Sequence, residues 1–379
     1  MKQLFMQPVD TFFFRNQKDF TPGVNSMAAS VFPPRPGTVY GALRSAYINQ
    51  YSTFEQFRTG CEGQVKEWMG TPVEPGRFRL RGCFLHDQQQ PILPLPLDYQ
   101  VVETEHTGEA AEIAYPLKLT LDVVPASDGR QYRLYGVRDE KSGSSAGAYL
   151  PLSDWKKALL EPSSVHIYRS SHWMIQEDKL GIARDWATRT AREGMLYQIK
   201  TNRFIEAKEP ARSPGLLAVC TDAPDFSEIS LVRLGGRNRP WALKSIPDEF
   251  GMFKAKEERL IEERIASSQI ARLILLTPAI WREDSSFYQQ QAGVFQLRPG
   301  LSFPVLAEAI GRPVLVGGWD IVRNAPKPRI QAVPAGTVLY LRVSKEQASA
   351  LVQGLKETMV SDELAYEGYG WAVCGPVKL

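Results

Sequence analysis

Three glycine-marked, basic stretches hold the residues of this chain that could bind phosphate. Residues 184–203 carry five cations and two carboxylates, residues 233–244 four cations and no carboxylate, and residues 312–329 four cations and one carboxylate. Glycine lets a backbone approach a phosphate closely with its N–H groups exposed, and arginine adds charge-assisted hydrogen bonds to the phosphate oxygens. The candidate contacts with a nucleic acid are Arg184, Arg189, Arg192, Gly235, Gly236, Arg237, Arg239, Gly317, Gly318 and Arg323.

Each stretch also contains one tryptophan, namely Trp186, Trp241 or Trp319. Such rings could stack on splayed bases, as the recognition of single-stranded RNA requires. The alternative is three solvated turns whose tryptophans are buried in the core. For any single stretch this alternative is favoured, but three such stretches in a nearly neutral chain make RNA binding an equal alternative.

The sequence lacks the common catalytic and metal-binding patterns. The four histidines do not have the spacing of H-E-x-x-H or H-x₃-H, the four cysteines form no C-x-x-C pair, and neither G-x-S-x-G nor a P-loop occurs. We therefore predict no enzyme activity, no metal and no cofactor. A metal-free ribonuclease needs a base, an acid and a cation, and His172 beside Arg184 could supply part of that. A hydrogen-bonded structural histidine is the commoner role.

Length and composition restrict the class of protein. With 379 residues the chain is long enough for two domains. The 45 basic and 42 acidic residues give a formal charge of +3, which is too small by itself to indicate a nucleic-acid partner. The scattered cysteines fit a reducing cytoplasm. The segment 1–8 is too short and polar for a signal peptide, and no apolar run approaches the ~18 residues of a membrane span.

A proline-rich joint at residues 32–37 must position part of this chemistry. Its prolines fix φ and remove backbone donors, so the loop is stiff, and Thr38 is the expected N-cap of a helix. From Val39 to Tyr47 the apolar residues recur at helical spacing, which predicts one buried face. The loop carries Arg35, and Arg44 lies on another side of the helix. The residues alone favour a structural role, in which the prolines end a strand and the chain continues into an ordinary core helix.

Alternating and apolar runs predict strands in both halves of the chain. Residues 78–85 alternate apolar with basic positions, and residues 92–97 contain prolines that are tolerated only at a sheet edge or in a connection. Residues 100–165 are rich in Gly, Ser, Asp and Glu, and we predict an insertion there with an exposed, mobile tip at 141–147. Further strands are predicted at 4–6, 195–204, 215–220, 229–234, 271–277, 313–316, 338–343 and 370–373, and further helices at 253–266 and 345–356.

This order of elements predicts an α+β fold that contains two copies of a split β-α-β sheet. The first domain would span residues 1–245, with the insertion at about 100–165, and the second would span residues 246–379.

Seven short segments stand in a joint order over nearly the whole chain. They are PVDTFFFR at 8–15, FPPRPGTVYGALR at 32–44, GIARD at 181–185, TRTAREGMLY at 188–197, GGWD at 317–320, AVPAGTV at 332–338 and GYG at 368–370. Together they resemble the RAMP superfamily of CRISPR proteins, and within it the family that forms subunit three of the type III-B (Cmr) effector complex.

The resemblance implies two ferredoxin-like, RRM-related domains whose glycine-rich loops face RNA. It implies a non-catalytic, cytoplasmic subunit that grips the repeat-derived 5′ handle of the CRISPR guide RNA. Its protein partners would be the large polymerase-type subunit and the first backbone subunit. It adds Gly368 and Gly370 to the candidate RNA surface, together with Arg35 and Arg44.

Two other functions stay open. Related RAMP proteins cut RNA, so a metal-free endoribonuclease that processes repeat RNA is one alternative. The other is a purely structural subunit whose basic patches bind acidic protein neighbours.

Overall fold

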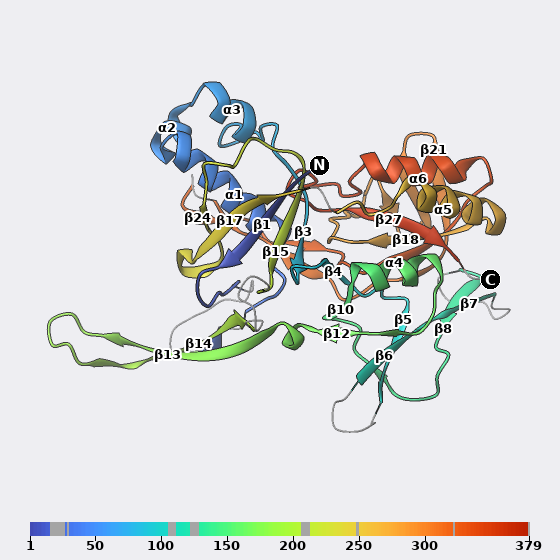
Figure 1. Cartoon of the computed structure of the whole chain (residues 1–379), viewed down its shortest axis with the longest axis horizontal. Helices are drawn as coiled ribbons and strands as arrows, with labels where there is room; N and C mark the ends of the chain where they lie inside the picture. Colours follow the sequence, from blue (N-terminus) through green and yellow to red (C-terminus); the bar gives the residue numbers. More distant parts are fainter. Residues whose placement is uncertain are drawn as a thin grey trace.

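Two large antiparallel sheets carry the fold (Figure 1). The structure is a computed structural model that describes residues 1–15, 27–28, 30–104, 111–121, 129–205, 213–247, 250–320 and 323–377. The eight-stranded sheet has the order β12-β10-β4-β3-β15-β1-β17-β16. In that order its strands are Tyr168–Arg169, Ala148–Pro151, Pro91–Pro94, Arg79–His86, Gly215–Asp222, Lys2–Pro8, Pro240–Ile246 and Leu231–Arg233.

The second sheet has six strands in the order β19-β20-β21-β26-β18-β27. In that order they are Tyr288–Gln289, Val294–Arg298, Leu301–Ala309, Val338–Arg342, Ile270–Leu275 and Ala372–Pro376. Helices α5 (Ala255–Ser268) and α6 (Gln347–Glu357) pack on this sheet. Every residue of β18 is buried, which explains why all its residues except Arg272 are apolar, because a strand covered on both faces has no solvent-facing side.

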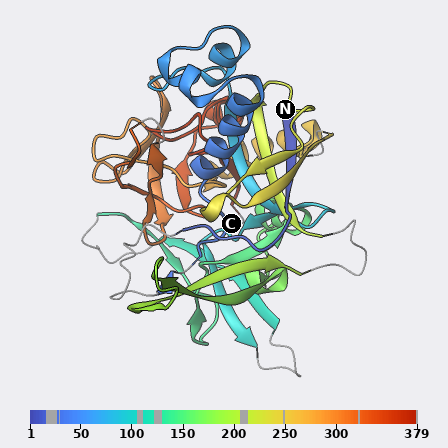
Figure 2. The ribbon, with the colours of Figure 1, turned by 90° about the vertical axis from the view of Figure 1, so that its left-hand side faces the viewer.

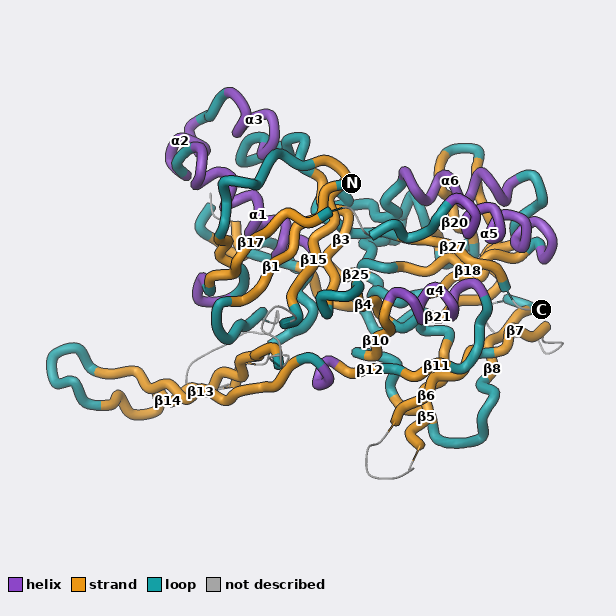
Figure 3. The backbone as a smooth tube through the Cα atoms, viewed as in Figure 1, coloured by secondary structure: helices purple, strands orange, loops and turns teal. Residues whose placement is uncertain are grey.

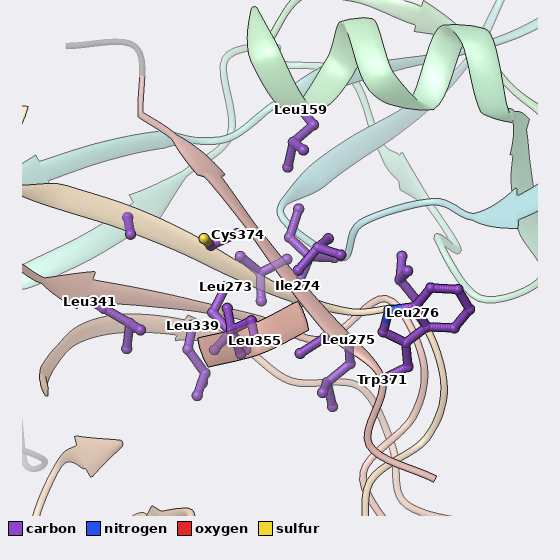
Figure 4. Close-up of a cluster of buried hydrophobic side chains, with 14 of the residues drawn as sticks. Leu159, Leu273, Ile274, Leu275, Leu276, Leu339, Leu341, Leu355, Trp371 and Cys374 are labelled. Atoms are coloured by element: carbon purple, nitrogen blue, oxygen red, sulfur yellow. The ribbon is translucent and has the colours of Figure 1, made fainter. Parts of the chain in front are cut away.

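The core of the six-stranded sheet is shown in Figure 4. Leu273, Leu275 and Leu339 lie close to Leu355 of α6, and Leu159 of α4 (Leu152–Leu160) reaches the sheet from another helix. A side chain at Gly375 would overlap Leu159, so α4 and β27 are in close contact. The same apolar cluster includes Phe84 and Leu217 of the eight-stranded sheet. One core therefore runs through both sheets, and the division of the chain at residues 245 and 246 stays a prediction.

The remaining strands form small sheets, and Figure 3 shows how they lie around the core. A four-stranded sheet joins β11, β6, β5 and β9 (Val165–His166, Ala111–Pro116, Tyr99–Thr104 and Ser142–Gly143). A three-stranded sheet joins β13, β14 and β2 (Met174–Arg184, Ala191–Phe204 and Met27–Ala28). Three further ladders have two strands each. They pair β7 (Lys118–Leu121) with β8 (Tyr132–Tyr135), and β22 (Val314–Val316) with β25 (Ile330–Ala332). The third pairs β23 (Trp319–Asp320) with β24 (Ala325–Pro326).

Helix α1 (Pro36–Tyr51) follows the proline-rich joint, and the short helices α2 (Phe54–Thr59) and α3 (Gly63–Met69) come next. The predicted N-cap is wrong. Arg35 is the N-cap residue and Pro36 opens the helix, because proline has the right φ for the first helical position and lacks an N–H that would be unpaired there anyway. The buried face agrees with the prediction at Val39, Ala42, Leu43 and Tyr47.

Most of the predicted strands and both later helices are confirmed within a few residues, but the prediction for the segment 92–97 is wrong. The prolines of the segment 92–97 do not place it at an edge. Strand β4 is an interior strand between β10 and β3, because Pro91 and Pro94 occupy its two ends, where missing donors cost least.

The insertion at 100–165 stays a prediction, and part of this segment belongs to the core. Strand β10 is an interior strand of the eight-stranded sheet, and α4 buries Trp155 completely. Its predicted tip is largely exposed, yet the Arg169 guanidinium donates to the carbonyls of Ser144 and Ala146 at 2.8 and 3.0 Å.

The helices within the described ranges include none that is long and apolar enough to cross a membrane.

Candidate nucleic-acid interface

Three segments that are far apart in the sequence meet at the start of α1. They are the joint at 35–37, the segment 366–370 and the basic hairpin that includes Lys327. The Glu367 carboxylate lies against Gly37, where any side chain would overlap it, and Lys327 Nζ is 3.7 Å from Glu367 Oε1. A side chain at Gly368 would be 3.3 Å from Pro36. The fold thus brings two of the glycine-marked motifs to the proline joint.

Arg35 is the cation at the centre of this meeting point. Its side chain is largely buried, and burial lowers its pKa, while the neighbouring Tyr369 and Tyr149 act in the opposite direction. Within the described residues, no hydrogen bond or ion pair engages the guanidinium. A guanidinium in such surroundings attracts an anion, and it stands at the N-terminal end of a helix, where the backbone also favours negative charge.

Two buried hydroxyl groups lie near the start of α1, and that of Tyr369 borders Arg35. Tyr369 is fully buried with its hydroxyl close to the Gly37 backbone, and Tyr40 is nearly buried; neither hydroxyl donates a hydrogen bond to a described residue. Burial raises the pKa of Tyr369 and raises that of Tyr40 to about 12, so both groups stay protonated and can donate. Buried hydroxyls normally find a partner. The Tyr369 donor beside the unpaired Arg35 is a feature of a polar, anion-accepting site.

The hairpin formed by β22 to β25 presents the third basic stretch. Val316 and Ala332 anchor its base in a small apolar cluster with Tyr369. Beyond the base, Trp319 is 57% exposed and the Arg323 side chain is 80% exposed. Gly318 is exposed, and a side chain there would make ordinary contact with Lys327. Residues 321–322 lie outside the description. This hairpin offers an exposed aromatic face and exposed cations in one place.

The first basic stretch lies at the end of the long β13–β14 hairpin, which projects from the body (Figures 1 and 3). The Asp185 carboxylate organises the turn, because Oδ1 accepts from the backbone N–H groups of Ala187 and Thr188 at 2.9 and 3.0 Å. Trp186 is 92% exposed, and Arg184 and Arg189 are exposed beside it. The side chain of Arg192 lies outside the description. The turn therefore holds an indole ring in solvent between two arginines.

The second basic stretch serves the core. Trp241 is fully buried, and its indole N–H donates to the Leu234 carbonyl at 3.1 Å. Gly235 has a φ of +85°, and the Gly236 N–H donates to the Phe13 carbonyl at 2.7 Å. The Arg239 guanidinium pairs with Asp10 at 2.8 Å, while Arg237 is exposed. The glycines are required here to let the chain pack on Phe13, so this stretch matches the alternative of a solvated turn around a buried tryptophan.

Arg44 and the terminal glycines also have roles within the fold. The Arg44 guanidinium donates to the Met69 and Thr71 carbonyls at 2.9 and 2.6 Å, which holds the loop after α3. Gly370 has a φ of +86° and packs against the Val360 backbone, and Gly368 has a φ of +97°. These glycines are needed for the turn that precedes β27.

The Arg35 site, the β22–β25 hairpin and the β13–β14 hairpin are the three candidate surfaces that have no other evident role in the fold, and all three lie at one end of the molecule. Figure 1 places α1, β24 and the β13–β14 hairpin at the end opposite to α5 and α6, and Figure 2 views that end directly. His172 and Arg184, the suggested ribonuclease pair, are separated by the full length of β13, which is roughly 35 Å for an extended strand. Among the described residues, no group of three or more His, Cys, Asp or Glu side chains could hold a metal ion.

Sequence reasoning did not identify Glu367, Lys327 or Tyr369. Glu367 is nearly buried, and burial raises its pKa, although Lys327 and Arg44 act in the opposite direction. The only sequence signal for these residues is their position next to the GYG motif and inside the third basic stretch. A single carboxylate gives no periodic pattern, so its partners become visible only in the folded chain.

The sequence model of the family described as "CRISPR-associated protein (Cas_Cmr3)" matches residues 4–377. No curated protein sequence matches the chain.

Solved structures are similar to this chain at low sequence identity, and the first one described here shares its fold. A chain in the cryo-EM structure of the type III-B Cmr-beta bound to cognate target RNA has 16% identity and a TM-score of 0.51, with 97% of this chain and 95% of that chain covered. A chain of the Csm3-Csm4 subcomplex of the type III-A CRISPR-Cas interference complex has 10% identity and a TM-score of 0.38, with 91% and 97% covered.

Proposed function

The chain belongs to the CRISPR-associated Cas_Cmr3 family, and from that premise we propose that it is an RNA-binding subunit of a type III-B ribonucleoprotein. A chain of the solved Cmr-beta complex bound to target RNA has the same overall fold as this chain. This similarity supports membership of such an assembly. In the proposed role the subunit grips the repeat-derived 5′ handle of the guide RNA. It also joins the large polymerase-type subunit to the first backbone subunit in the cytoplasm.

The observation that carries this proposal is the meeting of Arg35 with the 317–329 hairpin and the 366–370 segment. The unpaired Arg35 guanidinium, the buried Tyr369 hydroxyl beside it and the hairpin that carries the exposed Trp319 lie at one end of the molecule, at which the arginine-bearing β13–β14 hairpin also projects. Single-stranded RNA is bound by the same combination of cations along the backbone and aromatic rings under the bases.

We propose that each of the two large sheets belongs to one ferredoxin-like domain. All strands of the eight-stranded sheet come before residue 247, as does α1, and all strands of the six-stranded sheet come after residue 269, with α5 and α6 packed on it. The segment 100–165 would then be an elaboration of the first domain that adds β10 and α4 to the shared core.

The proposed subunit is not an enzyme. A metal-free ribonuclease is the alternative, but His172 and Arg184 lie at opposite ends of β13 and cannot act on one phosphate. Incubating the protein with end-labelled repeat RNA in chelator tests this alternative. The proposal predicts intact RNA. A defined product that disappears in His172→Ala would establish cleavage.

The test of RNA binding is a titration of single-stranded repeat RNA with the full chain at several salt concentrations. For each phosphate contact, the logarithm of the affinity should fall with a slope of roughly 0.7 in the logarithm of salt. Arg35→Met should weaken binding about tenfold and lower the slope by about 0.7, because one charge-assisted contact is lost. Arg259→Met, which removes an exposed cation from α5, is the matched control and should change neither. Equal effects of the two variants would contradict the proposal.

A further inference from the structure

Lys327 connects two parts of the candidate interface. Its backbone N–H donates to the Gly318 carbonyl at 2.9 Å, which closes the outer part of the 317–329 hairpin. Its ammonium group is 3.7 Å from Glu367 Oε1, in the segment that leads into the last strand. Lys327 therefore both closes the outer part of the hairpin and attaches it to the body of the protein.

The two partners of this ion pair are not equally exposed. The Lys327 side chain is 47% exposed, whereas the Glu367 side chain is only 8% exposed. Glu367 also lies on Gly37, at the positive end of α1. Its carboxylate is thus fixed by the body of the protein, and Lys327 is the more exposed partner that it holds.

The hairpin needs such an attachment beyond its base. Val316 and Ala332 are buried, but Trp319 and Arg323 extend outward and are largely exposed. A two-stranded ladder of this size is not stable on its own in water. Without the attachment, ordering Trp319 and Arg323 on a ligand would cost conformational entropy at the moment of binding.

We propose that Glu367 is a positioning residue of the RNA interface, which holds the 317–329 hairpin beside Arg35 through Lys327. Trp319 and Arg323 then meet RNA as a preformed surface. The inference rests on the proposed function and deepens it, since it assigns a carboxylate a supporting role in binding a polyanion.

Simple electrostatics predicts the opposite sign. A carboxylate beside cations repels phosphate, so its removal should tighten RNA binding if it did nothing else. A positioning role predicts weaker binding, although one negative charge is lost. The direction of the change therefore separates the two accounts.

The experiment compares Glu367→Gln, Lys327→Met and the double variant by titration with single-stranded RNA at several salt concentrations. Glu62→Gln, an exposed carboxylate on the N-cap of α3, is the control for the loss of one charge. Each single variant should weaken binding roughly threefold, as expected for one partly exposed pair, and the double variant should be no worse than either. The salt slope should stay at the wild-type value, because Lys327 contacts Glu367 and not phosphate.

The outcomes separate this inference from the proposed function. If wild-type protein does not bind RNA, the proposed function fails. If it binds, but Glu367→Gln tightens binding, or Lys327→Met lowers the slope by about 0.7, the positioning role is wrong. The variant Lys327→Met alters a side chain that is 47% exposed, so it remains a valid test even if Glu367→Gln is poorly folded.

Discussion

Arg272 and Asp98 form a bidentate ion pair in the interior, with Nε to Oδ2 at 2.7 Å and Nη2 to Oδ1 at 2.9 Å. Both side chains are at most 2% exposed. The Tyr340 hydroxyl donates to Asp98 at 2.7 Å. Burial alone would lower the pKa of Arg272, but the Asp98 charge raises it, so the guanidinium stays charged. It fastens the residue before β5 to strands β18 and β26.

Breaking this pair should be costly. Arg272→Met leaves the Asp98 carboxylate buried without its partner, and we expect a loss of about 3–5 kcal/mol in the free energy of unfolding. The double variant Arg272→Met with Asp98→Leu should recover most of that loss, because no charge remains buried. Urea denaturation followed by circular dichroism measures both. A double variant as unstable as Arg272→Met would show that the pair is not the cause.

The arginines at the end of the β13–β14 hairpin should act on RNA and not on stability. Replacing Arg184, Arg189 and Arg192 together by alanine should weaken RNA binding and flatten its salt dependence by about 0.7 for each phosphate contact that is lost. The melting temperature should stay the same, because Arg184 and Arg189 are exposed. Unchanged binding in a folded triple variant would remove this hairpin from the RNA surface.

Two tryptophans in similar basic stretches should respond in opposite ways. Trp186 is 92% exposed, so Trp186→Ala should leave stability unchanged and cost about 1–3 kcal/mol of RNA binding through lost stacking. Trp241 is fully buried, so Trp241→Ala should cost about 3–5 kcal/mol of folding stability. Thermal unfolding and RNA titration of both variants give the comparison. Destabilisation by Trp186→Ala would contradict the assignment.

Two glycines of α1 provide a matched pair. At Gly41 an added side chain meets no atom within 4 Å, so Gly41→Ala should stabilise the protein by about 0.5–1 kcal/mol through helix propensity. At Gly37 the added methyl overlaps the Glu367 carboxylate, so Gly37→Ala should lose that gain and also weaken RNA binding by displacing Glu367. Equal effects in both assays would show that Glu367 moves aside freely.

Helical and strand elements were predictable where an apolar period is continuous. The face of α1, helices α5 and α6 and the fully buried β18 all have that signal. The sequence did not indicate that part of the segment 100–165 belongs to the core, because the average composition of this segment is polar. Leu152, Trp155, Ala158 and Leu159 nevertheless form a helical stripe, and this local period decides the fold of α4.

The candidate site was predictable only in part, and for a physical reason. Charge and glycine content mark the stretches, but they do not say whether a side chain faces solvent. Trp319 and Trp186 are exposed while Trp241 fills the core, and Arg44 and Arg239 are used within the protein. Glu367 and Tyr369 owe their roles to contacts with residues more than three hundred positions away, which no local pattern records.

The most direct test of the account is photo-crosslinking of 4-thiouridine-substituted repeat RNA to the full chain, with the adducts mapped by mass spectrometry. The account predicts adducts on peptides that contain Trp319 or Arg323, and on the end of the β13–β14 hairpin around Trp186. Adducts confined to α5 and α6 at the opposite end of the molecule, or no adduct at all, would contradict it.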